Sequence, residues 1–255
     1  MPIKLWAVLL LLLCFPTVPA KANLGCTAGD RACLLSQLGK DADSITENNW
    51  RDQTYRELAK LLTSENKIAE ALKLIGKIKN PDTKAMTIRG IGMAAADLNL
   101  PEETLSDLFS KLRAEAATIE HEPSFAIALT YIAMSQAYAR DDQGAMTTAA
   151  SMTNAALRNK AYGETAEVQA ERNDLSAALQ SLAAIDDPGY KDKELGLVAK
   201  IFTNLNESDS ALTVAGQISN SYERAQALLY ILNHKTEAPA PVSTPAPTTE
   251  MDLQP

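Results

Sequence analysis

Aromatic residues make up only 5% of this 255-residue sequence, and glycine and proline are rare between its two ends. Runs of aromatic or β-branched residues, which favour strands, are also scarce. Alanine and leucine are abundant instead, and both fit an α-helix at low cost in free energy. The sequence therefore predicts an all-α fold, and its length is sufficient for one or two domains with a substantial core.

The usual signatures of catalysis are also missing. The two histidines, His121 and His234, do not stand at metal-ligand spacing from another histidine or a cysteine. The G-x-S-x-G and H-E-x-x-H motifs and a phosphate-binding glycine loop are absent. Ser64 and Lys67 form one S-x-x-K motif, but the partner motifs of serine acylases are missing, and Ser64 stands where a helix is expected to begin. We therefore expect no catalytic residues, no metal site, no cofactor and no enzyme.

Positive charge is in deficit. The sequence has 24 basic and 32 acidic residues, which give a formal net charge of −8. Removal of residues 1–22 would take away Lys4 and Lys21 but no acidic residue, so the net charge would become −10. Such a chain is repelled by nucleic-acid phosphates and by anionic lipids. We therefore expect no nucleic-acid partner.

The apolar run at the amino terminus is too short to cross a membrane as a helix. Leu5 to Phe15 is about 11 residues long, whereas a bilayer core of roughly 30 Å needs about 20. Lys4 precedes the run and small residues surround Ala22, as in a secretory signal peptide. We predict a signal peptide over residues 1–22 with cleavage near Ala22, no stable membrane span after cleavage, and a periplasmic or secreted location. A lipoprotein is the alternative, because Cys14 follows the leucine run, although lipid-attachment signals usually have a small residue before the cysteine.

Two cysteines, Cys26 and Cys33, remain after residue 22. An even pair in an exported protein favours a disulfide, and two free thiols are the alternative. We expect the segment 23–45 to carry this disulfide and a short helix. At the other end, residues 234–255 include five prolines among alanine, serine and threonine, and we expect a disordered tail or spacer.

Between these ends, over residues 46–233, alanines recur in pairs 12 residues apart. The pairs are Ala59/Ala71, Ala133/Ala145, Ala166/Ala178 and Ala199/Ala211. Apolar residues surround each alanine at helical spacing, so each pair marks two helices joined by a short break. The last three pairs are 33 residues apart, and Gly92, 33 residues after Ala59, marks another unit that carries eight extra residues. A last half unit, Ser221–Leu232, would cover the end of the array.

Small residues 12 apart on consecutive helices, repeated with a period near 34, resemble tetratricopeptide repeats. The segment Ile88-x-x-Ile91-Gly92 resembles the large-x-x-Leu-Gly segment of that family. The resemblance implies a right-handed α-solenoid of about five helical hairpins plus a capping helix. In the family, the first helices of the hairpins line a concave groove that commonly binds peptides or partner helices.

The resemblance also places a set of residues in that groove. They are Arg56, Arg89, Met93, Tyr131, Met134, Tyr138, Lys160, Lys193 and Lys200. The methionines and tyrosines would suit an apolar anchor of a partner, and the basic residues would suit an acidic or carboxylate-bearing ligand. The alternative is that the methionines and tyrosines pack between hairpins and the lysines form a solvated face.

We therefore predict an exported protein-interaction module or scaffold that binds a protein or peptide partner of the cell envelope in this groove. The alternative is a cell-envelope enzyme, or a helical substrate-guiding domain, that acts on cell-wall glycan. The many glutamates leave this alternative open, because a sequence does not give the distance between two carboxylates. The oligomeric state stays open as well.

Overall fold

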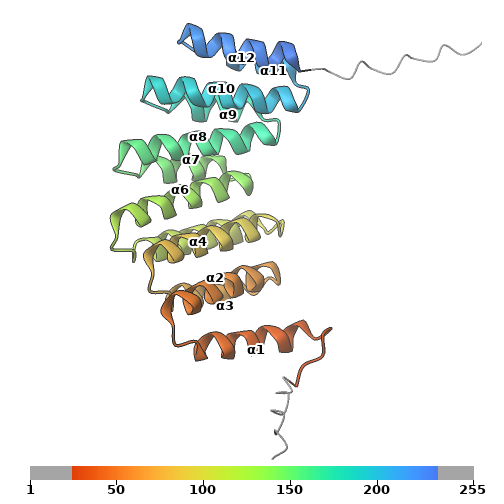
Figure 1. The fold of residues 1–255 in the computed structure, drawn as a ribbon, viewed down its shortest axis with the longest axis vertical. Coiled ribbons are helices and arrows are strands. Elements are labelled where there is room, and N and C mark those ends of the chain that lie inside the picture. Colours follow the sequence, from red (N-terminus) through yellow and green to blue (C-terminus); the bar gives the residue numbers. More distant parts are fainter. Residues whose placement is uncertain (1–24, 235–255) are drawn as a thin grey trace, which may run out of the picture.

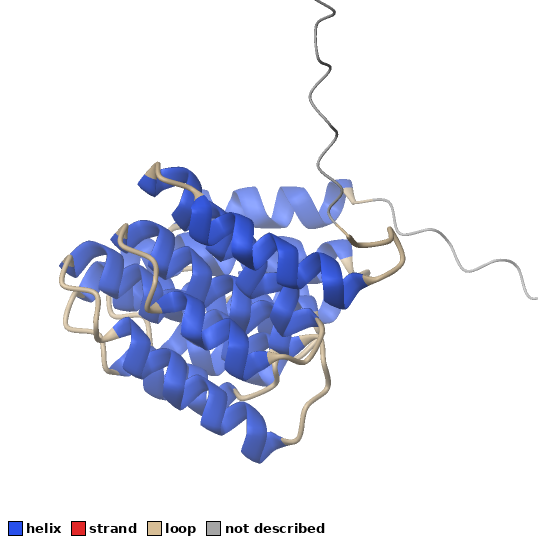
Figure 2. Ribbon diagram, turned by 90° about the horizontal axis from the view of Figure 1, so that it is seen from below, coloured by secondary structure: helices blue, strands red, loops and turns tan. Residues whose placement is uncertain are grey.

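The computed structural model describes residues 25–234, so the predicted signal peptide, Cys14 and nearly all of the predicted tail lie outside the described residues. Within this range the chain forms twelve α-helices and no strand, which confirms the predicted all-α class (Figure 1, Figure 2). In this part of the chain, no helix combines the length and the apolar character needed to cross a bilayer.

In chain order the helices are α1 (Arg31–Ser44), α2 (Asn48–Ser64), α3 (Ile68–Ile75), α4 (Pro81–Ala96), α5 (Glu102–Ala116), α6 (Glu122–Tyr138), α7 (Asp142–Ala150), α8 (Ala155–Glu171), α9 (Leu175–Ala183), α10 (Pro188–Asn204), α11 (Ser208–Ala215) and α12 (Ser221–Asn233). After α1, a long helix alternates with a shorter one. The shorter helices have 8 or 9 residues except α5, which has 15 because it contains the predicted insertion.

The helices pack in series. Each long helix contacts the next one, from α2 through α4, α6, α8 and α10 to α12, and each shorter helix contacts the long helices before and after it. The hairpins therefore follow one another along the longest axis of the molecule (Figure 1). Among the described residues the shorter helices make no comparable contacts with each other, so the long helices form the tighter of the two layers.

Small residues set the spacing of this array. All eight paired alanines belong to the core and have a relative exposure of 0%. Gly92 of α4 lies against α6, since an added Cβ there would come within 2.6 Å of the Ser135 Oγ. A larger side chain at any of these positions would push the helices apart.

A residue with positive φ follows each long helix from α2 to α10. These residues are Asn66, Asn99, Arg140, Asn173 and Asn206, with φ between 49° and 65°. Asparagine tolerates this left-handed region better than most residues. At the first turn, the amide of Asn66 donates to the Thr63 carbonyl and that of Lys67 donates to the Leu62 carbonyl, both at 2.8 Å. These bonds satisfy carbonyls that the helix end leaves free.

The first shorter helix begins later than the sequence predicts. Ser64 is the last residue of α2, and its Oγ donates to the Lys60 carbonyl at 3.1 Å. The left-handed turn at Asn66 follows, and Lys67 is the N-cap of α3. The prediction that Ser64 begins a helix is therefore wrong.

Buried polar side chains on some long helices hold the loop that leads to the next hairpin. Asp192 of α10, which is 6% exposed, accepts hydrogen bonds from the Ser219 amide (2.8 Å), the Ser219 hydroxyl (2.7 Å) and the Asn220 amide (2.8 Å). Asp52 of α2 and Asn159 of α8 accept from the backbone of the equivalent loops. Each contact fixes where the next long helix starts.

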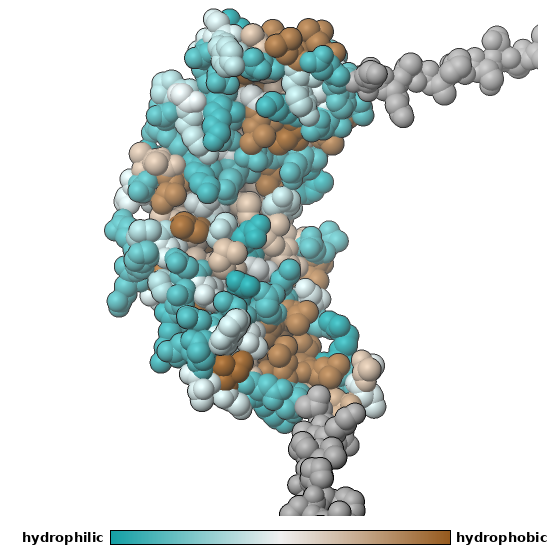
Figure 3. All heavy atoms as spheres, viewed as in Figure 1, coloured by the Kyte–Doolittle hydropathy of each residue, from teal (hydrophilic) through white to brown (hydrophobic). Residues whose placement is uncertain are grey.

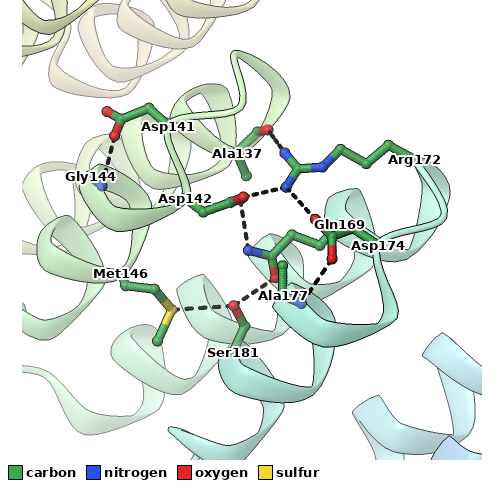
Figure 4. A network of polar contacts seen from close by, with 10 residues as sticks. All are labelled: Ala137, Asp141, Asp142, Gly144, Met146, Gln169, Arg172, Asp174, Ala177 and Ser181. Carbon is green, nitrogen blue, oxygen red and sulfur yellow. Dashed lines mark hydrogen bonds and ion pairs between the residues drawn. The ribbon is translucent and has the colours of Figure 1, made fainter.

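Arg172, in the turn after α8, joins two neighbouring hairpins (Figure 4). Its guanidinium donates to the Ala137 carbonyl of α6 and to the Asp142 carboxylate of α7. Asp142 also accepts from the Gln169 Nε2 at 2.8 Å, and the Gln169 Oε1 accepts from the Ser181 hydroxyl at 2.7 Å. The network pairs most of these polar groups, although the buried Arg172 Nε has no partner, and it links the two hairpins.

The two ends of the array are finished differently. Cys26 and Cys33 form the predicted disulfide, with their Cα atoms 5.7 Å apart, and tie the preceding segment to α1, which packs on α2. At the other end α12 contacts α10 and α11, the position predicted for a capping helix. Its outer side stays apolar, with Leu229 50% and Leu232 80% exposed, and a hydrophobic patch marks that end of the molecule (Figure 3).

Candidate functional site

The candidate site lies on the exposed side of the long helices, which we call the long-helix face. The face comprises the predicted groove residues other than Met134, together with the exposed or partly exposed Glu164, Glu167 and Glu171, and Glu194 lies buried beside them. Side-chain contacts run across it from helix to helix. The Arg89 guanidinium of α4 lies over the Tyr131 ring of α6, 5.4 Å from its centroid, and the Lys200 ammonium of α10 lies 5.6 Å from the centroid of the Tyr230 ring of α12.

Three of the predicted residues surround one pocket between α2 and α4. Arg56, Arg89 and Met93 line a cavity of about 350 Å³ together with Glu57, Lys60, Met86 and Gly90. Arg56 pairs with its neighbour Glu57 at 2.7 Å. The Nε of Arg89 is buried and has no hydrogen-bond partner.

The predicted residues on α6 divide between the surface and the core. Tyr138 is 41% exposed, and its hydroxyl donates to the Glu171 carboxylate at 3.1 Å. Met134 is partly buried and packs against the core. The packing alternative therefore applies to Met134, while Tyr131 and Tyr138 remain on the long-helix face.

The three predicted lysines are engaged by neighbours. Lys160 pairs with Glu164 at 3.5 Å, and the Lys193 ammonium lies 5.9 Å from the centroid of the Tyr190 ring. Lys200 lies over Tyr230, as described above. These lysines share the long-helix face with carboxylates, so the face carries charges of both signs. Its charge therefore gives no support to the predicted preference for an acidic ligand.

Three glutamates from α8 and α10 form the chemically unusual part of the face. Glu194 of α10 is 3% exposed, and its side chain packs on Gly163 of α8, where an added Cβ would come within 2.9 Å of the Glu194 Cδ. Glu164 and Glu167 of α8 lie beside it. The Oε2 atoms of Glu164 and Glu194 are buried and have no hydrogen-bond partner.

Burial disfavours the charged form of Glu164 and Glu167. Desolvation raises the pKa of Glu167 to about 7, and the adjacent Glu194 carboxylate adds to the shift. Desolvation also raises the pKa of Glu164, although Lys160 opposes this effect. The folded protein therefore holds this negative charge at a cost in free energy, which a proton or an external cation would relieve.

We expect the free energy of unfolding to fall by about 1–2 kcal/mol between pH 5 and pH 8, after allowance for solvent screening. The folded-state pKa of Glu167 lies above its ordinary value of 4.5, so the folded state binds more protons than the unfolded state between about pH 4.5 and 7. Stability is therefore lost as the pH rises through this window. Urea unfolding of wild type and Glu167→Gln, followed by circular dichroism at several pH values, measures the effect, and the variant should lose most of the pH dependence.

Asp43 and Asp186 do not contribute to the pH dependence of stability between pH 5 and pH 8. Hydrogen bonds, led by that from Lys77, lower the pKa of Asp43, and those from Asn159 and Arg158 lower that of Asp186. Their contribution is lost as the pH falls through the acid range below about 4, outside the window of Glu167. Equal pH slopes for wild type and Glu167→Gln between pH 5 and pH 8 would contradict the assignment.

One cluster has the composition of a catalytic triad but not its geometry. The Ser124 hydroxyl contacts the His121 Nδ1 at 2.7 Å and donates to the Asp82 carboxylate. In a triad the aspartate orients the histidine, whereas here it binds the serine, which is 0% exposed. The cluster anchors the start of α6. Among the described residues, no group of three or more histidine, cysteine, aspartate or glutamate side chains could hold a metal ion.

A polar cleft lies between α5 and the turn before α7. Its volume is about 470 Å³, and Glu102, Ser106, Arg140 and Gln143 line it together with Asp141. Asp141 is already used as the N-cap of α7, where it accepts from the Gly144 amide (2.8 Å) and from the Gln136 side chain (2.7 Å). The cleft lies beside the longer α5, and its residue Asp141 serves the local fold.

Sequence reasoning missed Glu167 and Glu194. Glu194 lies 33 residues after Ala161 and 66 after Ala128, and both alanines are 0% exposed. The repeat therefore puts an acidic residue at a buried register position. A check of each unit for a charge in a core position would have found it.

The comparisons with known proteins add little. No family model matches the sequence, and no curated protein matches it. Among solved structures, the crystal structure of Ton1535 from Thermococcus onnurineus NA1 is similar, with 12% sequence identity and a TM-score of 0.30 over 80% of this chain and 97% of that one. A TM-score this low supports no conclusion about fold or function.

Proposed function

We propose that the hairpins form a right-handed α-solenoid of tetratricopeptide-like repeats and that this chain is an exported module that binds a protein or peptide segment on its long-helix face. The serial helix contacts, the 33-residue period and the buried alanine pairs support the repeat architecture. The tighter packing of the long helices supports a curve with these helices on its inner side. The signal-peptide pattern and the Cys26–Cys33 disulfide support export.

The observation that carries this proposal is the pocket between α2 and α4. It combines the apolar side chains of Met86 and Met93 with charged groups from both helices, and it opens beside the Arg89–Tyr131 pair. Flexible methionines next to an arginine and a tyrosine are typical of surfaces that bind peptides.

The glycan-cleaving alternative receives no comparable support. A retaining glycosidase holds its two carboxyl groups about 5–5.5 Å apart, and an inverting one holds them further apart. Glu167 and Glu194 lie within hydrogen-bonding reach of each other, and Glu194 is almost completely buried. No sugar ring fits between two carboxyl groups in contact.

Selection from a random dodecapeptide display library tests the proposal. Wild-type protein, with its disulfide intact, should enrich a set of related peptides, and synthetic copies should bind in fluorescence anisotropy. The variant Arg89→Glu/Tyr131→Ala should weaken their binding at least about tenfold, which corresponds to about 1.4 kcal/mol.

The matched control is Lys73→Glu/Leu212→Ala, which reverses one charge and truncates one apolar side chain on the shorter helices. Both residues are exposed there. Circular dichroism establishes that each variant is folded. Failure to enrich any peptide, or equal loss of binding in both variants, would contradict binding on the long-helix face.

A further inference from the structure

We propose that Glu164, Glu167 and Glu194 form a subsite for a lysine or arginine side chain of the segment held on the long-helix face. This inference rests on the proposed function and adds the chemistry of the ligand. It concerns the part of the face formed by α8 and α10, on the far side of α6 from the pocket between α2 and α4.

The carboxylates of Glu167 and Glu194 lie close together where α8 and α10 meet. Gly163 leaves room for the Glu194 side chain to lie against α8, beside Glu167. A methyl group at position 163 would collide with the Glu194 carboxyl group, so the glycine is what permits this approach. The approach brings two carboxyl groups together in a partly dehydrated place, and their negative charge is unfavourable there unless a proton or an external cation joins them.

Two carboxylate oxygens of this cluster have no hydrogen-bond partner. Glu194 is 3% exposed, and its Oε2 has no partner. The Oε2 of Glu164 is also buried without a partner, although its Oε1 pairs with Lys160 at 3.5 Å. A buried carboxylate oxygen without a donor destabilises the folded state. Two such atoms from neighbouring helices provide the acceptors that an ammonium or guanidinium group requires.

The surrounding charges do not already fill this role. From α4, Arg89 acts on Glu164 at a distance but lies over the Tyr131 ring. From α6, Tyr138 binds Glu171, and within α8 Lys160 binds Glu164. From α10, Lys193 lies near the Tyr190 ring. None of these groups donates a hydrogen bond to the Glu194 Oε2.

The surroundings favour a basic side chain over a metal ion. Among the described residues these glutamates do not form a geometry that could hold a metal. The Tyr190 hydroxyl interacts with the Glu194 carboxylate, which leaves the Glu194 Oε2 without a partner, and the Tyr190 ring can contact the apolar stem or the charged end of a lysine or arginine.

The same dodecapeptide selection tests this inference through the composition of the peptides. Wild type should enrich peptides that share a lysine or arginine. Replacement of that residue by glutamine in a synthetic peptide, or of the protein residues in Glu167→Gln/Glu194→Gln, should weaken binding at least about tenfold. The control Glu115→Gln, on α5, should bind as wild type does. Thermal unfolding should show that the double variant is folded and at least as stable as wild type.

The outcomes separate the two proposals. Enrichment of peptides without a shared basic residue, or undiminished binding by the double variant, would overturn this subsite and leave the long-helix face as a peptide-binding surface. Failure to enrich any peptide would overturn both. Spermidine serves as a free organic cation: a rise in the melting temperature that depends on Glu167 and Glu194, without enrichment of basic peptides, would assign the subsite to a free polyamine and overturn the peptide form.

Discussion

Replacement of Asp192 by alanine should lower the free energy of unfolding by about 2–4 kcal/mol. Asp192 accepts three hydrogen bonds from the loop between α11 and α12, and its side chain is 6% exposed. The substitution would leave the Ser219 and Asn220 amides without their acceptor and would release the start of α12. Urea unfolding followed by circular dichroism measures the loss.

Asp192→Asn is the matched control, because an asparagine side chain keeps one acceptor oxygen at the same place. The equivalent position in α8 is Asn159, which accepts from the Asp186 amide at 3.2 Å. We therefore expect Asp192→Asn to cost less than half as much as Asp192→Ala. A similar loss for both substitutions, or a loss below about 0.5 kcal/mol for alanine, would contradict the role of this carboxylate as the anchor of the loop.

Gly92→Ala should destabilise the protein by about 1–3 kcal/mol, although alanine is the better helix former. The added Cβ would come within 2.6 Å of the Ser135 Oγ and 2.8 Å of its Cβ, so α4 and α6 would have to move apart. The reason is steric, and the loss should appear as a lower midpoint in urea unfolding.

Gly196→Ala is the control for this effect. Gly196 lies inside α10, and an added Cβ there would meet nothing within 4 Å. We expect this substitution to stabilise the protein by about 0.5–1 kcal/mol, as alanine does in an open helix position. If both glycine substitutions changed stability in the same direction, the close approach of α4 and α6 would not be the cause.

Much of the fold could be predicted because small residues recur in the sequence at the positions where the helices pack closely. The alanine pairs predicted which helices contain the hairpin cores, and those alanines are fully buried. The turns were harder to predict from the sequence. Ser64 is a residue type that often begins a helix, but it is the last residue of α2. The asparagines at positions 66, 99, 173 and 206 could have indicated these turns, because a left-handed residue recurs after each long helix from α2 to α10.

The candidate site was predictable only in part. The resemblance to tetratricopeptide repeats was enough to name Arg56, Arg89 and Met93, which line one pocket. It could not predict the partners of the lysines, because side-chain pairing across helices depends on their separation. Nor could it predict the contact of Glu194 with Gly163, which joins residues on different hairpins.

The most direct test of binding on the long-helix face is site-specific photo-crosslinking. A photoreactive benzoylphenylalanine is placed at Met93, beside the pocket between α2 and α4, or at Leu212, which is 47% exposed on α11. With a peptide taken from the selection, the account predicts a crosslinked product for the substitution at Met93 and none at Leu212. Crosslinking at Leu212 without crosslinking at Met93 would contradict it.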